Sequence, residues 1–269
     1  MYRFLLTPRW IALALVMALA AAIMVLLGNW QLSRYQYRSD VNARIDAAAS
    51  APPRALDEVL APPAGAQVGP APTTEDTWSV VSVTGRYDPE HEIVVRARSL
   101  DGSSGYEIVT PLVLADGTAI LVNRGFLAAP AGAASAIPAT PAPPSGEVEV
   151  VGRISAPESR ATAPELVADR LTVRRIDPAK IAEVLPYPVY GGYITLQSQT
   201  PPASDELTPL PPDRQNALLN AGYTLQWWIF AALTLVGYGY LAYRHAHPRE
   251  SETPDPSAVS AGMSGRTPS

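Results

Sequence analysis

The feature that most constrains this chain is a pair of long, uncharged apolar stretches, one near each end. Residues 11–28 consist only of Leu, Ile, Val, Met, Ala and Gly, and residues 223–243 are mostly apolar. At a rise of about 1.5 Å per residue, a helix of either length crosses a hydrocarbon layer about 30 Å thick. The sequence therefore predicts two transmembrane helices, over residues 11–30 and 222–243.

A cleaved signal peptide is the alternative interpretation of the first stretch, because Arg3 and Arg9 precede it and small residues fill its middle. However, the apolar run exceeds the usual length of a signal-peptide core, and no small-x-small cleavage pattern precedes polar sequence. The run ends instead on Gly28-Asn29-Trp30. These features favour a retained membrane anchor.

Positively charged residues flank the two predicted spans on their terminal sides. Arg3 and Arg9 precede the first span, and Arg244 and Arg249 follow the second. Because Lys and Arg accumulate in cytoplasmic flanks, we expect both termini in the cytoplasm and the central region outside it. The expected divisions are a cytoplasmic N-terminus (1–10), an extracytoplasmic domain (31–221) and a disordered cytoplasmic tail (244–269).

Between the spans, alternation of apolar and polar residues predicts β-strands, as in WSVVSVTGRYD at residues 78–88. Asp116-Gly117 is a hairpin signal, because both residues tolerate positive φ. Asp177-Pro178 predicts the N-cap and first position of a short helix that ends near Val184. Further strands are expected at residues 92–98, 106–114, 147–154, 171–176 and 189–197, and in a return strand that ends at Gly125.

Two Pro- and Ala-rich segments interrupt the strands, at residues 61–73 and 128–146. Their low complexity indicates surface excursions that bury no core. Strands joined mostly by turns, with few helices, predict an α+β fold. We therefore expect two transmembrane helices flanking a mainly antiparallel, barrel-like β domain.

Composition excludes several classes of function. The chain has no cysteine, which excludes a CxxC redox or copper-relay site. Its four Met residues lie in the first span or at the termini, so they offer no thioether copper site to the central domain. The formal net charge of −5 speaks against a nucleic-acid partner.

The sequence contains no recognisable catalytic or metal-binding motif. The only histidine between the spans is His91, which follows Asp88-Pro89-Glu90 and is interpreted as a solvated turn residue. His245 and His247 could bind a metal in principle, but beside Arg244 they are interpreted as polar residues next to the membrane. We therefore expect no enzyme activity, no catalytic residues and no metal site.

Polar side chains occur near the expected outer ends of both spans. An amide at this depth needs a partner. If the two helices are neighbours, Gln31 and Gln226 could bond to each other at a gain of about 1 kcal/mol, and interfacial water is the alternative partner. Ala14, Ala18 and Ala22 form a small-residue stripe suited to close contact between helices or subunits. The interfacial aromatic residues beside the glutamines are Trp30, Tyr223 and Trp227.

The helical pattern continues beyond the first span. Trp30, Arg34 and Arg38 recur at every fourth position and therefore share one face of a helix. Ala51-Pro52-Pro53 is expected to end this helix.

Four segments, in this order, resemble the surfeit locus protein 1 family of cytochrome c oxidase assembly factors, in an actinobacterial-like bacterial form. They are LGNWQLSRYQYR, VSVTGRYD, GYEIVTPLVLADGTAILVNRGFL and YTLQWW, and the resemblance covers the chain from Trp10 to Tyr243. It implies a plasma-membrane assembly factor that stabilises the terminal oxidase core subunit during haem A insertion. The implied partners are that subunit, a haem A synthase and membrane lipid.

Two alternative functions, from other classes of protein, remain. One is a structural envelope protein whose central domain binds a peptide or a cell-wall partner. The other is a sensor or transporter subunit, which the short polar tail after Arg244 disfavours.

The resemblance also implies a histidine three residues before Tyr223 in members linked to haem binding. This chain has Asn220 there, within LNAGYTLQWW. Asn is a poor iron ligand beside imidazole, so we do not expect Asn220 to bind haem A axially. A role as scaffold for the oxidase subunit is compatible with this difference.

Asn123 and Arg124 stand at the expected end of a strand, before a turn at Gly125. Arg124 could stabilise the fold by pairing with a nearby carboxylate such as Glu107. Its planar guanidinium could instead bind a haem propionate or a partner's carboxylate. The other candidates for such a partner surface are Asn123, Arg34 and Arg38.

Overall fold

The computed structural model describes residues 2–130, 137–212 and 214–247. Contacts divide the chain into two compact units, each of which is described by itself. The helical unit comprises the described residues up to Ser39 and from Asn216 onward, and the β domain comprises Asp40–Gln215. The expected disordered tail lies outside the described residues from position 248 onward.

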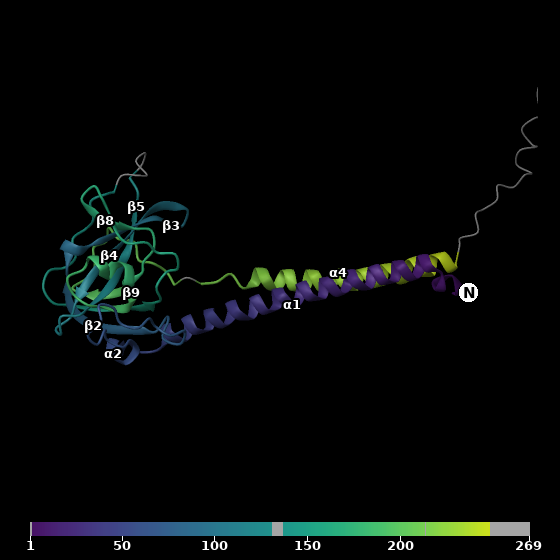
Figure 1. Cartoon of the computed structure of the whole chain (residues 1–269), viewed down its shortest axis with the longest axis horizontal. Helices are drawn as coiled ribbons and strands as arrows, with labels where there is room; N and C mark the ends of the chain where they lie inside the picture. The colour runs from purple at the N-terminus through teal and green to yellow at the C-terminus, as the bar shows by residue number, and fades with distance from the viewer. Residues whose placement is uncertain (1, 131–136, 213, 248–269) are drawn as a thin grey trace, which may run out of the picture. The chain divides into compact units, whose positions relative to one another are not determined.

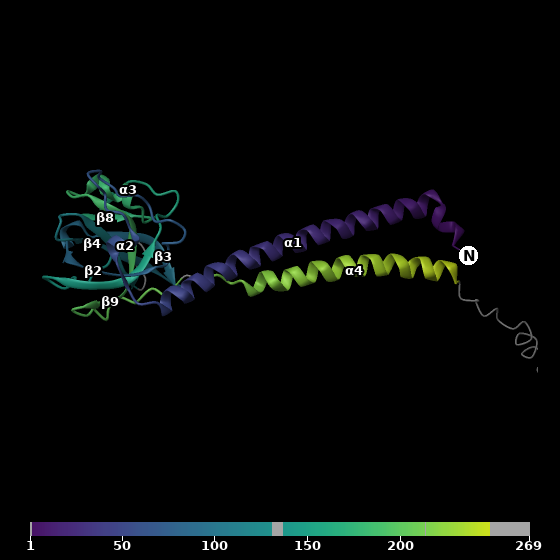
Figure 2. The same ribbon diagram turned by 90° about the horizontal axis from the view of Figure 1, so that it is seen from below.

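Two long helices make up the helical unit. α1 (Pro8–Ser50) and α4 (Leu218–Ala246) run side by side in Figures 1 and 2, and the short 3-10 helix η1 (Arg3–Leu6) precedes α1. Both long helices are long and apolar enough to cross a membrane, as predicted. α1 ends directly before Ala51-Pro52-Pro53, which confirms the predicted stop, and its last turns belong to the β domain.

Small residues let α1 and α4 approach closely. Gly28 is buried, and a Cβ at this position would lie 2.5 Å from the ring of Trp228. Ala21 and Ala231 are also buried. The stripe of Ala14, Ala18 and Ala22 does not make this contact, since Ala18 and Ala22 are exposed, and its alternative role in contact with a partner subunit stays a prediction. Spacing alone identified a small-residue face of α1, but not the face that meets α4.

The β domain is built on a nine-stranded sheet in the order β1-β2-β6-β9-β5-β4-β3-β8-β7. All seven predicted strands are present. The two that were not predicted, β1 and β7, are two and three residues long, too short to show a periodic pattern. The strands are β1 (Arg54–Ala55), β2 (Val80–Tyr87), β3 (Ile93–Leu100), β4 (Ser103–Val113), β5 (Ala119–Ala128), β6 (Val148–Ser155), β7 (Glu165–Val167), β8 (Arg170–Val173) and β9 (Val189–Thr200).

Short helical turns connect some of the strands. α3 (Pro178–Ile181) continues into η3 (Ala182–Val184), and the side chain of Asp177 accepts a hydrogen bond from the N–H of Ala179 at 3.0 Å. This confirms the predicted N-cap and the predicted helix. The other short elements are α2 (Leu56–Val59) and η2 (Pro89–His91).

Most neighbouring strands in the described sheet are antiparallel, as expected. The exceptions are the parallel pairs β1–β2, β3–β8 and β5–β9. β2 also pairs with β4 at Arg86↔Val113 and Tyr87↔Leu112, which joins the two ends of the run β2-β6-β9-β5-β4. The mixed α/β architecture with a large sheet is therefore established, and the barrel-like form stays a prediction.

β5 is buried on both faces of the sheet, which explains its run of consecutive apolar residues. Ile120 and Val122 pack into one core cluster with residues of β2, β6 and β9, whereas Ala119 and Leu121 pack into a second cluster with β3 and α3. Successive side chains of a strand point to opposite faces, so a central strand covered on both sides lacks a polar alternation.

Two hairpin turns contain an Asp-Gly pair, and the one at Asp116-Gly117 was predicted. Asp101 and Gly102 have φ values of 50° and 80°, and they join Leu100 to Ser103 as a two-residue loop. At Asp116-Gly117 only the glycine has positive φ, at 81°.

The two Pro- and Ala-rich segments are more closely packed than expected. In the first, Gln67 donates a hydrogen bond to the carbonyl of Tyr187 at 3.0 Å, and Val68 forms a β-bridge with Val189. In the described part of the second, Ile137 packs against a cluster that contains Ile108. Residues 131–136 of the second segment lie outside the described residues. The described parts are irregular, but they are not purely surface excursions.

Candidate functional site

Asn123, Arg124 and Gly125 form a β-bulge inside β5 rather than the end of a strand. The register between β4 and β5 shifts here, since Ile108 pairs with Gly125 and Val109 pairs with Asn123. Arg124 is the extra residue. Gly125 has a φ of 138°, and its N–H donates to Oδ1 of Asn123 at 3.3 Å. The predicted turn at Gly125 was wrong, because Gly125 is part of the bulge and β5 continues beyond it to Ala128.

The bulge directs Arg124 into a buried charge cluster. Its side chain is 0% exposed, and Nη1 donates to Oε2 of Glu92 at 3.1 Å and to the carbonyl of Pro141 at 3.0 Å. The guanidinium carbon lies 5.7 Å from the centroid of the Tyr87 ring. Oε1 of Glu92 accepts from Arg170 at 2.7 Å. Arg124 therefore pairs with a nearby carboxylate, one of the two alternatives expected, but that carboxylate is Glu92 and not Glu107, the example given.

This cluster holds charges that solvent barely reaches. Burial lowers the pKa of Arg124, and the nearby Glu92 carboxylate and Tyr87 oppose this shift. Arg124 already has a carboxylate partner in Glu92, which is itself 7% exposed. The geometry supports a role of Arg124 in the fold, and its role in recognition stays a prediction.

Asn123 belongs to a different group, on the wall of a cleft of about 650 Å³ in the β domain. Its Nδ2 donates to Oε2 of Glu107 at 2.7 Å. Glu107 also pairs with Nε of Arg98 at 3.3 Å, and Arg98 contacts Glu158 at 2.6 Å. Burial raises the pKa of Glu107, although Arg98 and Asn123 oppose the shift. We name this depression the Arg153 cleft, after another residue that lines it.

The helical unit contains a hydrogen-bonded chain of polar residues between α1 and α4. Nδ2 of Asn220 donates to Oε1 of Gln31 at 2.7 Å, and Oδ1 of Asn220 accepts from Nη1 of Arg38 at 2.9 Å. The same Arg38 nitrogen donates to the carbonyl of Asn216 at 3.0 Å. Gln31 therefore pairs with Asn220, and its expected pairing with Gln226 was wrong, because the side chain of Gln226 is exposed.

The remaining interfacial candidates lie on the surface of the helical unit. Arg34 is exposed, and so are Trp30 and Tyr223, whereas Trp227 is half-buried. Such a pattern is expected of aromatic residues that face the headgroup region of a membrane. Of the two arginines on the α1 face, only Arg38 takes part in the polar chain around Asn220.

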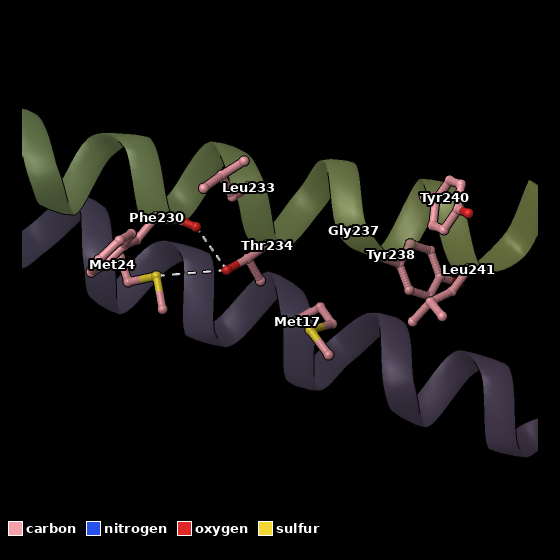
Figure 3. Close-up of a pocket in the computed structure, with 9 residues that line it drawn as sticks. All are labelled: Met17, Met24, Phe230, Leu233, Thr234, Gly237, Tyr238, Tyr240 and Leu241. Atoms are coloured by element: carbon pink, nitrogen blue, oxygen red, sulfur yellow. Dashed lines mark hydrogen bonds between the residues drawn. The ribbon is translucent and has the colours of Figure 1, made fainter.

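An apolar groove lies between the two helices farther along the unit. Figure 3 shows Met17 and Met24 of α1 facing α4, where the Thr234 hydroxyl contacts the sulfur of Met24 at 3.7 Å and donates to the carbonyl of Phe230 at 2.8 Å. The groove encloses about 580 Å³, and Tyr238 also lines it. Its lining is mainly aliphatic and aromatic, which suits contact with lipid.

The residue at position 220 does not fit axial ligation of a haem iron. Haem iron is held in proteins by imidazole, thiolate, thioether or phenolate groups. Asn220 is an amide whose nitrogen and oxygen are both hydrogen-bonded within the unit. His245 lies against Phe4 and Trp10. Within the described ranges, no group of three or more His, Cys, Asp or Glu side chains could hold a metal ion.

Comparison with known proteins decides the family. The sequence matches the SURF1 family over residues 18–232, which is most of the chain. This protein belongs to the SURF1 family. It is similar to uncharacterized SURF1-like proteins of Mycobacterium tuberculosis and Mycobacterium bovis, at 29% identity over 252 residues, covering 93% of this chain and 89% of each relative. A SURF1-like protein of Monosiga brevicollis is 30% identical over 143 residues, covering 48% of this chain and 47% of the relative.

Membership of the SURF1 family confirms the resemblance of the four sequence segments. The family is generally linked to cytochrome oxidase assembly and is not a known enzyme family. Together with the two candidate membrane helices, it indicates that this SURF1-family chain is a membrane protein.

Several residues of the two charged groups in the β domain were not predicted from the sequence. Glu92, Arg98 and Arg153 are charged residues inside strands or at their starts, positions where isolated charges are usually solvated. The sequence did contain one signal that Arg98 and Arg153 could be buried. Each lies in a strand segment whose apolar residues occupy both faces of the strand. Their partners are 9 and 57 positions away in sequence, at Glu107 and Leu210, so spacing could not identify them.

Proposed function

We propose that this chain is a membrane-anchored assembly factor for cytochrome c oxidase, which stabilises the oxidase core subunit during haem A insertion. The observation that carries the proposal is the SURF1-family match, which includes most of α1, the first half of α4 and the whole β domain. Its partners are the core subunit, a haem A synthase and the surrounding lipid.

The proposed location is the plasma membrane, with both termini in the cytoplasm and the β domain outside it. Arg3 before α1, Arg9 in its first turn and Arg244 near the end of α4 support this orientation, because positive charge concentrates in cytoplasmic flanks.

The proposed contribution is that of a scaffold and not of an axial haem ligand. Asn220 supports this part of the proposal, because its amide links Gln31 and Arg38 across the two helices. The chain would therefore position the oxidase subunit, and any direct contact with haem A would use groups other than residue 220.

Redox difference spectra of membranes test the assembly function directly. A strain that lacks this gene is expected to lose the haem a band and oxidase activity, and the wild-type gene is expected to restore both. An unchanged band with intact oxidase activity would instead support the alternative, an envelope protein that binds a peptide or cell-wall partner.

Haem spectra of the purified protein test the scaffold assignment. The wild-type chain is expected to purify without an axially ligated haem signal, and the Asn220→His variant serves as the matched comparison, because it supplies the imidazole. A six-coordinate haem spectrum in the wild type that persists in Asn220→Ala would show that another residue of this chain binds the iron.

A further inference from the structure

Arg153 is a buried cation without a described carboxylate partner. It lies in β6 between β2 and β9, opposite Val80 and Thr195, and is 7% exposed. Its Nη2 donates to the carbonyl of Leu210 at 2.9 Å. None of the ion pairs in the described chain includes it, and burial lowers its pKa. A buried charge is costly unless it is paired, so a negatively charged group beside Arg153 would stabilise it.

Two other arginines are already paired: Arg214, which lines the Arg153 cleft, and Arg98, which contacts carboxylates of its wall. Arg98 contacts Glu107 and Glu158, and Arg214 contacts Asp46. The carboxylates of Glu107 and Glu158 line the cleft, and both contact Arg98. Of the two arginines in the described lining, Arg153 is the one without a carboxylate partner, so it is the group there that can pair with an anion.

The walls of the cleft add an apolar surface and hydroxyl groups. Trp78, Leu100 and Tyr193 supply rings and an aliphatic side chain, and the hydroxyls of Ser155 and Thr195 lie 3.0 Å apart. A volume of about 650 Å³ falls within the range of small-molecule sites, roughly 300–1,000 Å³. A ligand that fits these walls has an anionic end and a partly apolar body.

The backbone at Trp78 is also unusual. Its φ is 79°, a value that a non-glycine residue rarely adopts, and its N–H donates to the carbonyl of Ile154 at 2.9 Å. Strained residues of this kind concentrate at binding sites, where surrounding contacts hold them in place. This strain places an indole on the wall of the cleft next to the strand that carries Arg153.

We propose that the Arg153 cleft binds a small organic carboxylate, with the guanidinium of Arg153 as its charge partner and the Trp78 side of the cleft against its apolar body. A planar guanidinium matches a carboxylate in geometry and charge. The proposal goes beyond the assembly function and does not depend on it, because it rests only on the β domain.

Titration calorimetry of the full chain in lipid nanodiscs tests this site with phenylbutyrate as the probe. Phenylbutyramide has the same shape without the charge, and it is expected to bind much more weakly. Arg153→Gln is expected to weaken phenylbutyrate binding by about 10- to 100-fold, the range for loss of a charge-assisted hydrogen bond. Arg86→Gln, which removes an exposed arginine from β2, is the matched control and is expected to leave binding unchanged.

A second measurement locates the probe. Trp78 is the only tryptophan between the two membrane helices, so phenylbutyrate is expected to change the fluorescence of the wild type but not of Trp78→Phe.

Arg153→Lys keeps the positive charge, and it replaces Arg153→Gln in the calorimetry if the neutral variant does not fold. Phenylbutyrate is then still expected to bind more tightly than the uncharged phenylbutyramide.

Three results would overturn the proposal. In the first, phenylbutyrate and phenylbutyramide bind equally well, or neither binds. In the second, a peptide with a free C-terminal carboxylate binds while phenylbutyrate does not. In the third, binding occurs only in Asp213→Asn, which would show that the chain's own Asp213, outside the described residues, already neutralises Arg153.

Discussion

At the scale of single residues, the buried pair of Arg124 and Glu92 is the most demanding feature of the β domain. The Arg124 side chain is fully buried and that of Glu92 is 6% exposed. Such a pair contributes little compared with an apolar pair, but removal of one partner leaves an uncompensated charge in the core.

Glu92→Gln is therefore expected to lower the free energy of unfolding of the β domain by about 3–5 kcal/mol, because Arg124 loses its counter-charge. Denaturant unfolding followed by circular dichroism measures the loss. Glu165→Gln is the control, because it breaks the pair with Arg96 in which the Glu165 side chain is 64% exposed, and it is expected to cost less than about 1 kcal/mol. Similar losses in both variants would contradict the account.

Glu107 gives a prediction for pH dependence. Burial raises its folded-state pKa, so the folded state holds the proton more tightly than the unfolded state. The contribution of this group to stability therefore decreases as the pH rises from the unfolded pKa through the raised folded pKa. Glu107→Gln lacks this titration and keeps an acceptor for Asn123. Its stability relative to the wild type is expected to increase across this window and to level off above it, in urea unfolding between about pH 4 and pH 7. A relative stability that falls over the same window would exclude the assignment.

Sequence reasoning identified Asn123-Arg124-Gly125 as unusual but gave the wrong local structure. A bulge depends on the register between β4 and β5, which is a property of two strands and not of one. For the same reason, Glu107 was named as an example of a partner for Arg124. In the fold the partner is Glu92, which directly precedes β3. The chemistry of each residue could be predicted from the sequence, but its partner could not, because the partner depends on how the strands pair in the sheet.

At the scale of elements, the contact between α1 and α4 depends on Gly28. Because a Cβ there would lie 2.5 Å from the Trp228 ring, a β-branched residue must push the helices apart or displace the ring. The side chains of Met24 and Thr234 meet at 3.7 Å, and the chain has no cysteine of its own, so a cysteine pair at these positions reports the contact without background.

Gly28→Val is expected to reduce the yield of the cross-link between cysteines at positions 24 and 234 several-fold. Ala22→Val, on an exposed position of the same helix, is expected to leave it unchanged. Equal yields in the two variants would show that α1 and α4 do not pack through Gly28.

Most elements were predictable because their signals are local. The helix stop at Ala51-Pro52-Pro53, the cap at Asp177 and the seven longer strands follow from residue type and periodicity. The parallel pairing of β5 with β9 did not follow, because it joins segments about 70 residues apart. The partner of Gln31 was missed for a related reason, since the rotation of α1 against α4 decides which amide it meets.

At the scale of the whole molecule, α1 and α4 are two candidate membrane helices, and the β domain lies between them in sequence. The apolar stretches predicted the two helices, and the ordered motifs indicated the SURF1 family, which the family match confirms. The Arg153 cleft was not predicted, because its wall combines residues of β3, β4, β5, β6 and β9 with residues before β2 and before α4.

Labelling of single cysteines with a membrane-impermeant maleimide in intact cells tests the central claim most directly. The chain has no native cysteine, so Thr7→Cys, Asp101→Cys and Arg244→Cys each report one position. The account predicts labelling at position 101, in an exposed turn of the β domain, and protection at positions 7 and 244 until the membrane is permeabilised. Protection at position 101 together with labelling at either end would contradict it.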